Sequence, residues 1–273
     1  MGLLNKLVYD GVDSSDFLIY LSGEGVFNAP TRKGEEVVIP GRNGTLWIDE
    51  GCFNPISVKY PAFVGTKDED EFREVLGQFR AELSSRGSYC KLTDTYHPDE
   101  FRLALFKDGL ETQPRLYNRA GEISLTFECK PQRFLVSGEE VHAFTGIGSI
   151  TNPTLFTASP LIRVTGNGKV LIGDYMFIVS DNPGTIWIDT ELMTVYIPAA
   201  GEDQHLTDEH GIVIYDELGT VIDISLGSTT PELMNSHVQF VNSLMPKIVP
   251  GTVNVGMTSG ITKLEIIPRW WTV

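Results

Sequence analysis

The side chains best suited to hold a metal ion gather between residues 201 and 211, in the stretch GEDQHLTDEHG. Imidazole and carboxylate groups are common ligands of zinc and calcium, and this stretch supplies Asp203, His205, Asp208, Glu209 and His210. Their spacing matches neither the histidine pair of a zinc-binding helix nor a calcium-binding loop. We therefore interpret the stretch as an exposed polar loop between strands, and we expect no bound metal.

Motifs of enzymes are missing from the sequence. It has no G-x-S-x-G nucleophile elbow and no H-E-x-x-H pair. Arg163 stands where a phosphate-binding loop ending in Gly168-Lys169 needs its first glycine, and GIGSIT at 146–151 lacks the third glycine of a dinucleotide-binding loop. The sequence thus predicts neither catalysis nor a cofactor. An enzyme remains an alternative, because the paired carboxylates of a glycosidase can lie far apart in a sequence.

The tryptophans offer a second kind of chemistry, since a flat indole can serve as a platform for a sugar ring. Trp47 and Trp187 each lie between apolar neighbours in strand-like segments, where packing in a core or an interface is commoner. Trp270 and Trp271 are adjacent, so in a strand their rings point to opposite faces. We expect at least one of these two to meet solvent or a partner. A stand-alone carbohydrate-binding module is therefore the alternative function.

Bulk composition excludes other classes. The 273 residues carry a formal net charge of −15, whereas a DNA-reading protein needs clustered Lys and Arg to neutralise phosphates. An acidic surface is compatible with DNA that passes without sticking. No apolar window approaches the ~18 residues of a membrane span, and the first residues have too short an apolar run for a signal peptide. Cys52, Cys90 and Cys129 are odd in number and far apart, which predicts reduced thiols.

Charged residues divide the chain into two parts. Residues 1–140 hold 16 basic and 23 acidic residues, and residues 141–273 hold only 5 and 13. A stretch rich in Gly, Ser and Thr separates them. We predict a first domain over 1–140, a linker over 141–150 and a second domain over 151–273.

The first part is predicted to be mostly β with one amphipathic helix over 66–87. A single face of that helix carries the apolar residues Phe72, Val75, Leu76, Phe79 and Leu83. Thr66 with Glu69 fits a capping box at its start, and Arg86 followed by Gly87 fits its end.

The second part is predicted to be all β, because short strand-like segments alternate with Gly and Pro as in a β-sandwich. Within it, Gly166-Asn167-Gly168 predicts the turn of a β-hairpin.

Several segments, taken in order, resemble the distal tail protein family of long-tailed (siphovirus-type) bacteriophages. They are DFLIYLSGEG, APTRKGEEVVIPGRNGTLWIDEG, the single amphipathic helix, FECKPQRF and the terminal IIPRWW. In one respect the end departs from the usual pattern, in which a charged residue follows the Trp, because Trp271 and Thr272 stand there.

The resemblance implies a β-rich first domain with one helix and a projecting hairpin arm, followed by a galectin-like or carbohydrate-module-like β-sandwich. It further implies a structural hub, a hexameric ring at the tail tip or baseplate of a virion, assembled in the cytoplasm of the bacterial host. Its partners would be copies of itself, the tail tube protein, a tail-associated hub or lysin and receptor-binding proteins. DNA would be passing cargo only, a cell-wall saccharide would be a further ligand, and no membrane insertion is implied.

An arm is also consistent with the residues themselves. The segment 24–45 is polar, contains Gly and Pro, and has few core-type residues before Val37. We expect the oligomer interface to include its end, namely Pro40, Gly41, Arg42, Asn43 and Gly44, because the glycines permit a turn and the two polar side chains are exposed donors. The stretch GRNGTLWIDEG (41–51) is predicted to be where the arm leaves and rejoins its own domain.

Overall fold

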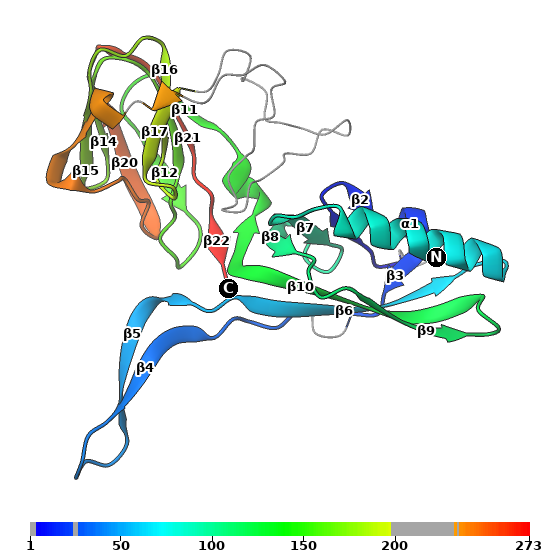
Figure 1. Ribbon diagram of the computed structural model, residues 1–273. Helices are drawn as coiled ribbons and strands as arrows, with labels where there is room; N and C mark the ends of the chain where they lie inside the picture. The colour runs from blue at the N-terminus through cyan, green and yellow to red at the C-terminus, as the bar shows by residue number, and fades with distance from the viewer. Residues whose placement is uncertain (1–3, 24–26, 198–231, 234) are drawn as a thin grey trace. The chain divides into compact units, whose positions relative to one another are not determined.

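The computed structural model describes residues 4–23, 27–197, 232–233 and 235–273, and within them the chain forms two compact units (Figure 1). Among the described residues, the first unit comprises the chain up to Arg133 together with Val273, and the second runs from Phe134 to Thr272. Residues 141–150, which we expected to be a linker, instead contribute β11 (His142–Phe144) and the first part of β12 (Gly148–Asn152) to the second unit. The functional division into domains at 140 and 151 stays a prediction.

The first unit is an antiparallel sheet with one α-helix. Its strands are β1 (Leu7–Tyr9), β2 (Val12–Asp13), β3 (Ile19–Leu21), β4 (Arg32–Val38), β5 (Thr45–Phe53), β6 (Ile56–Gly65), β7 (Cys90–Asp94), β8 (Glu100–Leu105), β9 (Leu110–Arg115) and β10 (Ala120–Leu135). The main sheet has the order β2-β1-β7-β8-β10-β6-β3, and β9 also pairs with β10. The pair β4–β5 forms a separate ribbon.

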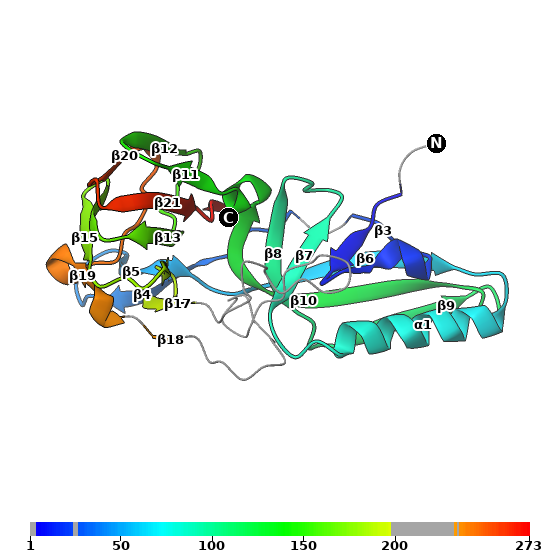
Figure 2. The same ribbon diagram turned by 90° about the horizontal axis from the view of Figure 1, so that it is seen from above.

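The helix α1 (Glu69–Ser84) covers one face of this sheet (Figures 1 and 2). The predicted apolar face is confirmed, because Phe72, Phe79 and Leu83 are buried and Val75 and Leu76 pack against the same cluster. Strand residues alternate between the two faces of a sheet, and every second residue of β6 and β10 belongs to the same apolar cluster as the helix, namely Val58, Tyr60, Ala62, Val64, Ile123, Leu125 and Phe127. No helix in the described part of the chain is long and apolar enough to cross a membrane.

The ends of α1 differ from the sequence-based expectation. The N-cap is Asp68, whose Oδ1 accepts a hydrogen bond from the backbone N–H of Glu71 at 2.9 Å. The Glu71 carboxylate accepts from the N–H of Lys67 at 2.7 Å in return. Thr66 donates its hydroxyl hydrogen to backbone carbonyls instead. Capping therefore occurs two residues later than predicted, because Asp68 also provides a carboxylate with the same three-residue spacing to a glutamate.

The helix α1 ends earlier in the sequence than predicted. Ser85 is the C-cap, in a right-handed conformation, and its N–H donates to the carbonyls of Ala81 and Glu82. Arg86 Nη1 donates to the Glu82 carbonyl at 2.8 Å, which satisfies an end carbonyl as expected of a cation there. Gly87 has no positive φ, so its role as a left-handed cap is wrong.

The second unit is a sandwich of two antiparallel sheets. One has the order β11-β21-β13-β16-β17-β18 and the other β12-β20-β14-β15-β19. The remaining bounds are β13 (Leu161–Gly166), β14 (Gly168–Ile172), β15 (Tyr175–Val179), β16 (Thr185–Asp189), β17 (Thr194–Ile197), β18 (Glu232–Leu233), β19 (Val238–Phe240), β20 (Gly251–Met257) and β21 (Ile261–Ile267). The last strand, β22 (Trp271–Thr272), belongs to neither of these two sheets and pairs with β10. Inward residues of both sheets share one apolar cluster, for example Val164, Ile188 and Leu264 with Ile172, Phe177 and Val255. The predicted β-sandwich is confirmed, and its likeness to galectins stays a prediction.

The glycines at 166 and 168 do not form a hairpin turn. β13 pairs with β16 and β21, whereas β14 pairs with β15 and β20, so the chain passes from one sheet to the other at Asn167. Gly166 has a φ of +98°, and a Cβ there would lie 2.3 Å from the carbonyl oxygen of Gly260. Glycine is required because two backbones approach closely at this crossing.

An ion pair between a half-buried arginine and a buried aspartate joins the end of β16 to the C-terminal segment. Arg269 Nη1 and Nη2 donate to the two carboxylate oxygens of Asp189 at 3.0 and 2.8 Å. Burial alone would lower the pKa of Arg269, but the Asp189 carboxylate raises it overall. Asp189 also accepts from the N–H groups of Glu191 and Leu192. The arginine of IIPRWW therefore has a structural role, because an unpaired buried carboxylate would be strongly destabilising.

The cap assignment leads to a testable difference between two acidic residues. Asp68→Ala removes the capping bond and is expected to lower the free energy of unfolding of the first unit by about 1 kcal/mol. Asp70→Ala removes an exposed carboxylate whose ion pair with Arg73 is also exposed, so a much smaller change is expected. Urea titration followed by circular dichroism, with hydrogen exchange of the α1 amides, measures both. Equal losses in the two variants would contradict the assignment.

Candidate functional site

The ribbon of β4 and β5 is the candidate functional element, and residues 32–53 are called the arm from here on. β4 and β5 pair with each other, and no other strand of the described residues joins them. The arm extends away from the sheet of the first unit (Figure 1). Every residue from 38 to 52 is exposed. The projecting hairpin that the resemblance implied is thus present.

The root of the arm is tied down by hydrogen bonds. Asn54 donates its backbone N–H to the Thr31 carbonyl at 2.9 Å and its side-chain Nδ2 to the Thr31 hydroxyl at 3.1 Å. Further back, the buried Arg102 of β8 donates from Nη2 to the carbonyl of Asn28 at 3.3 Å. The two chain segments that enter and leave the arm are therefore fixed relative to each other.

Ion pairs cross the arm near its root. Arg32 Nη1 lies 2.6 Å from Asp49 Oδ2, and Lys33 Nζ lies 2.9 Å from Glu50 Oε2. Hydrogen bonding to Glu50 raises the pKa of Lys33. Exposed pairs of this kind contribute little stability each. Their effect is on register, because opposite charges across two strands favour one alignment over a slipped one.

Apolar side chains occupy both faces of the arm. Residues directly opposite in an antiparallel pair share a face, so Val37 and Leu46 lie on one face together with Ile48. Trp47, which is 47% exposed, lies on the other face with Val38. A two-stranded ribbon is only marginally stable in water, and exposed apolar strands promote association. Both faces are thus suited to being covered by another protein surface.

Gly34 allows Trp47 to lie flat across β4. A Cβ at position 34 would be 2.5 Å from the indole Cζ2 and 2.6 Å from the carbonyl oxygen of Ile48. The register also shifts between Arg32 and Gly34, as at a β-bulge. The indole is therefore held against the backbone with its outer side exposed.

The tip of the arm is a tight turn over residues 39–42. The N–H of Arg42 donates to the carbonyl of Ile39 at 3.1 Å, and Gly41 has a φ of +79°. A Pro at the second position and a Gly with positive φ at the third are typical of a type II β-turn. Gly44 also has a φ of +79°, and a Cβ added at either glycine would meet nothing within 4 Å. Glycine is favoured at both positions because of the positive φ, and not because a side chain would clash with neighbouring atoms.

The stretch 41–51 consequently has a different place from the one we predicted. It forms the tip and the returning strand of the arm, whereas the arm leaves and rejoins its domain near Asn28 and Asn54. The sequence argument failed because glycines permit a sharp turn equally well at the tip and at the root. The assignment of Pro40–Gly44 to an oligomer interface stays a prediction.

The tryptophans of the second unit are engaged within it. Trp270 is only 3% exposed and belongs to the core, so it is not an outward contact in this structure. Trp271 is half-buried; its ring stacks on Phe156 with centroids 4.4 Å apart, and its Nε1 donates to the Thr157 carbonyl at 3.0 Å. Trp187 is 9% exposed, and the Arg163 guanidinium lies 4.1 Å from its ring centroid. None of these three indoles offers an open face of the kind that stacks on a sugar.

Histidines and carboxylates were the candidate metal ligands. The stretch 203–210 lies outside the described residues. His97 Nδ1 is 3.0 Å from Asp94 Oδ1, His142 lies in β11, and His237 Nδ1 is 3.1 Å from the Asp181 carbonyl. Across residues 4–23, 27–197, 232–233 and 235–273, no group of three or more His, Cys, Asp or Glu side chains could hold a metal ion.

Two buried arginines in the first unit were not anticipated. Arg102 is buried, and its Nη1 has no hydrogen-bond partner among the described residues. Burial lowers the pKa of Arg102, and the charge of Arg133 lowers it further. Arg133 Nη1 lies 3.4 Å from Glu100 Oε2. Alternation in FRLALF would place Arg102 on an open face, so the sequence carries no signal for its burial.

Comparison with solved structures identifies proteins of the same fold. The chain is similar to the Dit protein (gp 19.1) of phage SPP1, described as a paradigm of the hub adsorption apparatus in Gram-positive infecting phages. The TM-score is 0.66 at 14% identity, covering 99% of this chain and 100% of that one. It is also similar to a chain of the phage p2 baseplate in its activated conformation with Sr, with a TM-score of 0.51 at 9% identity, covering 97% of each chain. No family model and no curated protein sequence matches the chain. At such identities the likeness shows a shared fold.

The contact of Trp47 with Gly34 can be tested by substitution. Gly34→Ala places a methyl group against the indole, so Trp47 is expected to leave β4 and become more accessible. Tryptophan fluorescence should shift to longer wavelength and acrylamide quenching should increase, while the unfolding midpoint changes little because the arm is exposed. Glu35→Ala, the neighbouring substitution on the opposite face, is the control. Identical spectra for Gly34→Ala and the unaltered chain would contradict the contact.

Proposed function

We propose that this chain is a structural hub protein of a bacteriophage tail tip or baseplate. In this proposal copies of the chain, six by the family resemblance, form a ring that joins the tail tube to the host-recognition apparatus and leaves a channel for DNA. The likeness in fold to the SPP1 Dit protein supports it, because it extends over nearly all of both chains. The segments of the sequence that resemble distal tail proteins support it independently.

The arm is the observation that carries the proposal. A subunit that joins its neighbour head to tail needs a protruding element and a different surface to receive it, and such contacts close into a ring when the rotation permits. The arm protrudes, is braced at its root, and exposes apolar side chains on both faces. An element of this kind is costly for a monomer and useful in an assembly.

Net charge is consistent with a channel for DNA. The chain carries 36 acidic and 21 basic residues. DNA phosphates are repelled by such a surface, so a passing strand would not be held as it would be by clustered cations. We therefore assign DNA the role of cargo.

The other proposed partners follow from the position of a hub. They are the tail tube protein on one side, and a tail-associated hub or lysin and receptor-binding proteins on the other, all within the virion. Binding of a cell-wall saccharide by the second unit stays a prediction, and the engaged indoles of Trp187, Trp270 and Trp271 give it no support.

The ring can be tested directly with the purified chain and one arm variant. Electron microscopy should show rings with a central hole, and light scattering should give a symmetric oligomer whose fraction rises with concentration. Arg42→Ala removes an exposed charged donor at the tip and is expected to weaken assembly about tenfold, while circular dichroism stays unchanged. Particles that remain monomeric at every concentration argue against the hub. Undiminished rings with Arg42→Ala argue against the role of that residue alone.

The native thiol of Cys52 reports whether the arm is covered. Cys52 is exposed on β5, whereas Cys90 and Cys129 are buried. Burial raises the pKa of Cys90 and raises that of Cys129 to about 12, so neither forms a thiolate readily at pH 8. We expect a thiol reagent to label Cys52 alone in the monomer. Its labelling rate should fall at least tenfold in assembled rings.

Cys52→Ser is the control for this measurement, since it should abolish the fast reaction in both states. A rate that is the same in monomer and ring would show that the returning strand of the arm stays uncovered.

A further inference from the structure

The turn between β9 and β10 has an unusual backbone. Leu116, Tyr117 and Asn118 have φ values of 50°, 56° and 60°. Residues other than glycine visit this left-handed region mainly as single residues, so three in succession form a strained turn. Glycine would relieve the strain at any of the three positions. Strain of this kind persists where the surrounding structure imposes it, and it is frequent at binding sites.

Hydrogen bonds hold this turn in place. Arg119 donates its N–H to the Leu116 carbonyl at 3.3 Å, and its own carbonyl accepts from the N–H and the hydroxyl of Thr66 at 2.8 and 3.0 Å. Asn118 Nδ2 donates to Glu69 Oε1 at 3.0 Å. The backbone of the turn is thus attached by hydrogen bonds to the start of α1.

Two large side chains on this turn face solvent, and they are called the knob. Leu116 is 73% exposed and Tyr117 is 95% exposed. Tyrosine has only two side-chain torsions, so it loses little conformational entropy on binding, and it is frequent among residues that dominate interfaces. Arg115 and Arg119 flank the knob in the sequence. It therefore combines apolar area, one hydroxyl and two cations.

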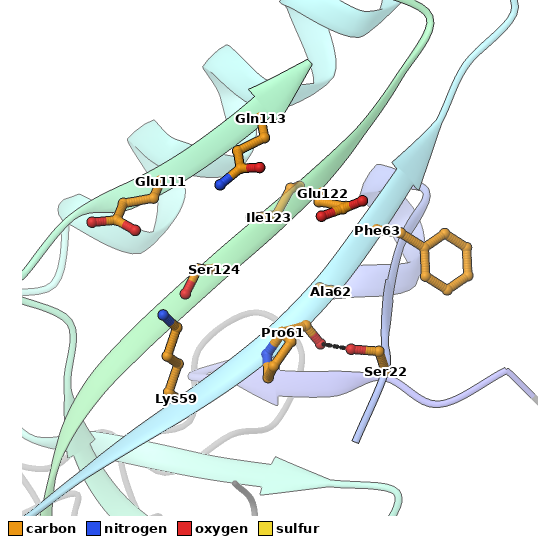
Figure 3. Close-up of a pocket in the computed structure, with 10 residues that line it drawn as sticks. All are labelled: Ser22, Lys59, Pro61, Ala62, Phe63, Glu111, Gln113, Glu122, Ile123 and Ser124. Carbon is orange, nitrogen blue, oxygen red and sulfur yellow. Dashed lines mark hydrogen bonds between the residues drawn. The ribbon is translucent and has the colours of Figure 1, made fainter. Parts of the chain in front are cut away.

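A groove lies on the face of the same sheet that α1 leaves uncovered (Figure 3). It has a volume of about 460 Å³ and is lined by residues of β6, β9 and β10. Phe63 supplies an exposed ring, and Glu111 and Glu122 supply carboxylates. The hydroxyl of Ser124 is buried and has no hydrogen-bond partner among the described residues. This hydroxyl has no exposed surface, so the polar groups that a bound partner can reach are those of Glu111, Gln113 and Glu122.

We infer that the knob of one copy of this chain docks in the groove of a second copy. Leu116 and the ring of Tyr117 cover Phe63, and the tyrosine hydroxyl lies among the exposed polar groups of Gln113 and Glu122. Charge favours the same pairing, since two arginines flank the knob and two carboxylates line the groove.

Two other charges bear on this pairing. Lys59 also lines the groove and adds a single positive charge. The two carboxylates of the groove outnumber it, so the groove keeps a net negative charge. Within one copy Arg115 Nη2 lies 3.7 Å from Glu122 Oε1, and both side chains are mostly exposed. A pair so exposed exchanges partners at little cost, so Arg115 and Glu122 are free to meet their counterparts on another copy.

Knob and groove are different surfaces, so the contact is head to tail and can repeat around a ring. The inference rests on the proposed ring and names one of its contacts. An assembly that forms without this contact leaves the proposed function intact and removes the inference.

Disulfide trapping tests the contact. The variant pairs Tyr117→Cys with Glu111→Cys in a Cys52→Ser background and is oxidised at concentrations that give assembly. Position 117 lies in the turn beyond Arg115, the last residue of β9. Positions 111 and 115 are already four strand residues apart, about 14 Å. A disulfide needs Cα atoms within about 7 Å, so a bond between positions 111 and 117 of one copy is not expected. A ladder of covalent oligomers on a non-reducing gel is expected. Tyr117→Cys with Arg80→Cys, on the exposed side of α1, is the control and should give no ladder.

Single substitutions give an independent measure. Tyr117→Ala should weaken self-association at least tenfold, and Tyr117→Phe severalfold through loss of the polar contacts of the hydroxyl group. Leu155→Ala, which removes a comparably exposed side chain from the second unit, should have no effect. Rings that form equally well with Tyr117→Ala, together with the absence of a ladder, would overturn the inference and leave the hub proposal standing. A chain that neither associates nor cross-links would overturn both.

Discussion

The pairing of β6 with β10 is the interaction on which the first unit depends. It runs without interruption from Ala120 opposite Gly65 to Cys129 opposite Ile56, a length of about 30 Å at the usual rise per residue. Alternation along this pair sends one set of side chains into the core under α1 and the other set to the opposite face. A slip of one residue would exchange the two faces. The buried set of Tyr60, Leu125 and Phe127 therefore also determines the position of the groove.

The same pairing places the exposed elements at opposite ends. β5 leads into β6 at the end near Ile56, so the arm begins there, and the turn before β10 lies beside Gly65 at the other end. An assembly that propagates head to tail needs two separate surfaces on one rigid body. A single continuous ladder provides this rigidity, since both ends are joined by the same backbone hydrogen bonds. The strained knob and the braced arm are features that a monomer alone would not require.

The second unit is organised differently. Two sheets bury one apolar cluster between them, and the C-terminal segment is held by the Arg269–Asp189 pair and by the burial of Trp270. Its aromatic residues stabilise the unit instead of forming an open platform. A charged pair around a buried carboxylate requires both partners, so Arg269 and Trp270 of the terminal IIPRWW contribute to packing within this unit.

The sequence by itself determined those features that depend on local pattern. The apolar face of α1, the β-rich character of both parts and the turn-forming glycines at 41 and 44 follow from periodicity and backbone freedom. Tertiary structure decided what depends on partners distant in the chain. Asp68 rather than Thr66 caps the helix, Gly166 serves a crossing between sheets, and the glycines at 41 and 44 lie at the tip of the arm. Burial of Arg102 and Trp270, and the meeting of β6, β9 and β10 around Ser124, likewise come from contacts tens of residues apart. The physical reason is that a residue's type limits its conformations, whereas its exposure and its partners are fixed only when the strands are paired.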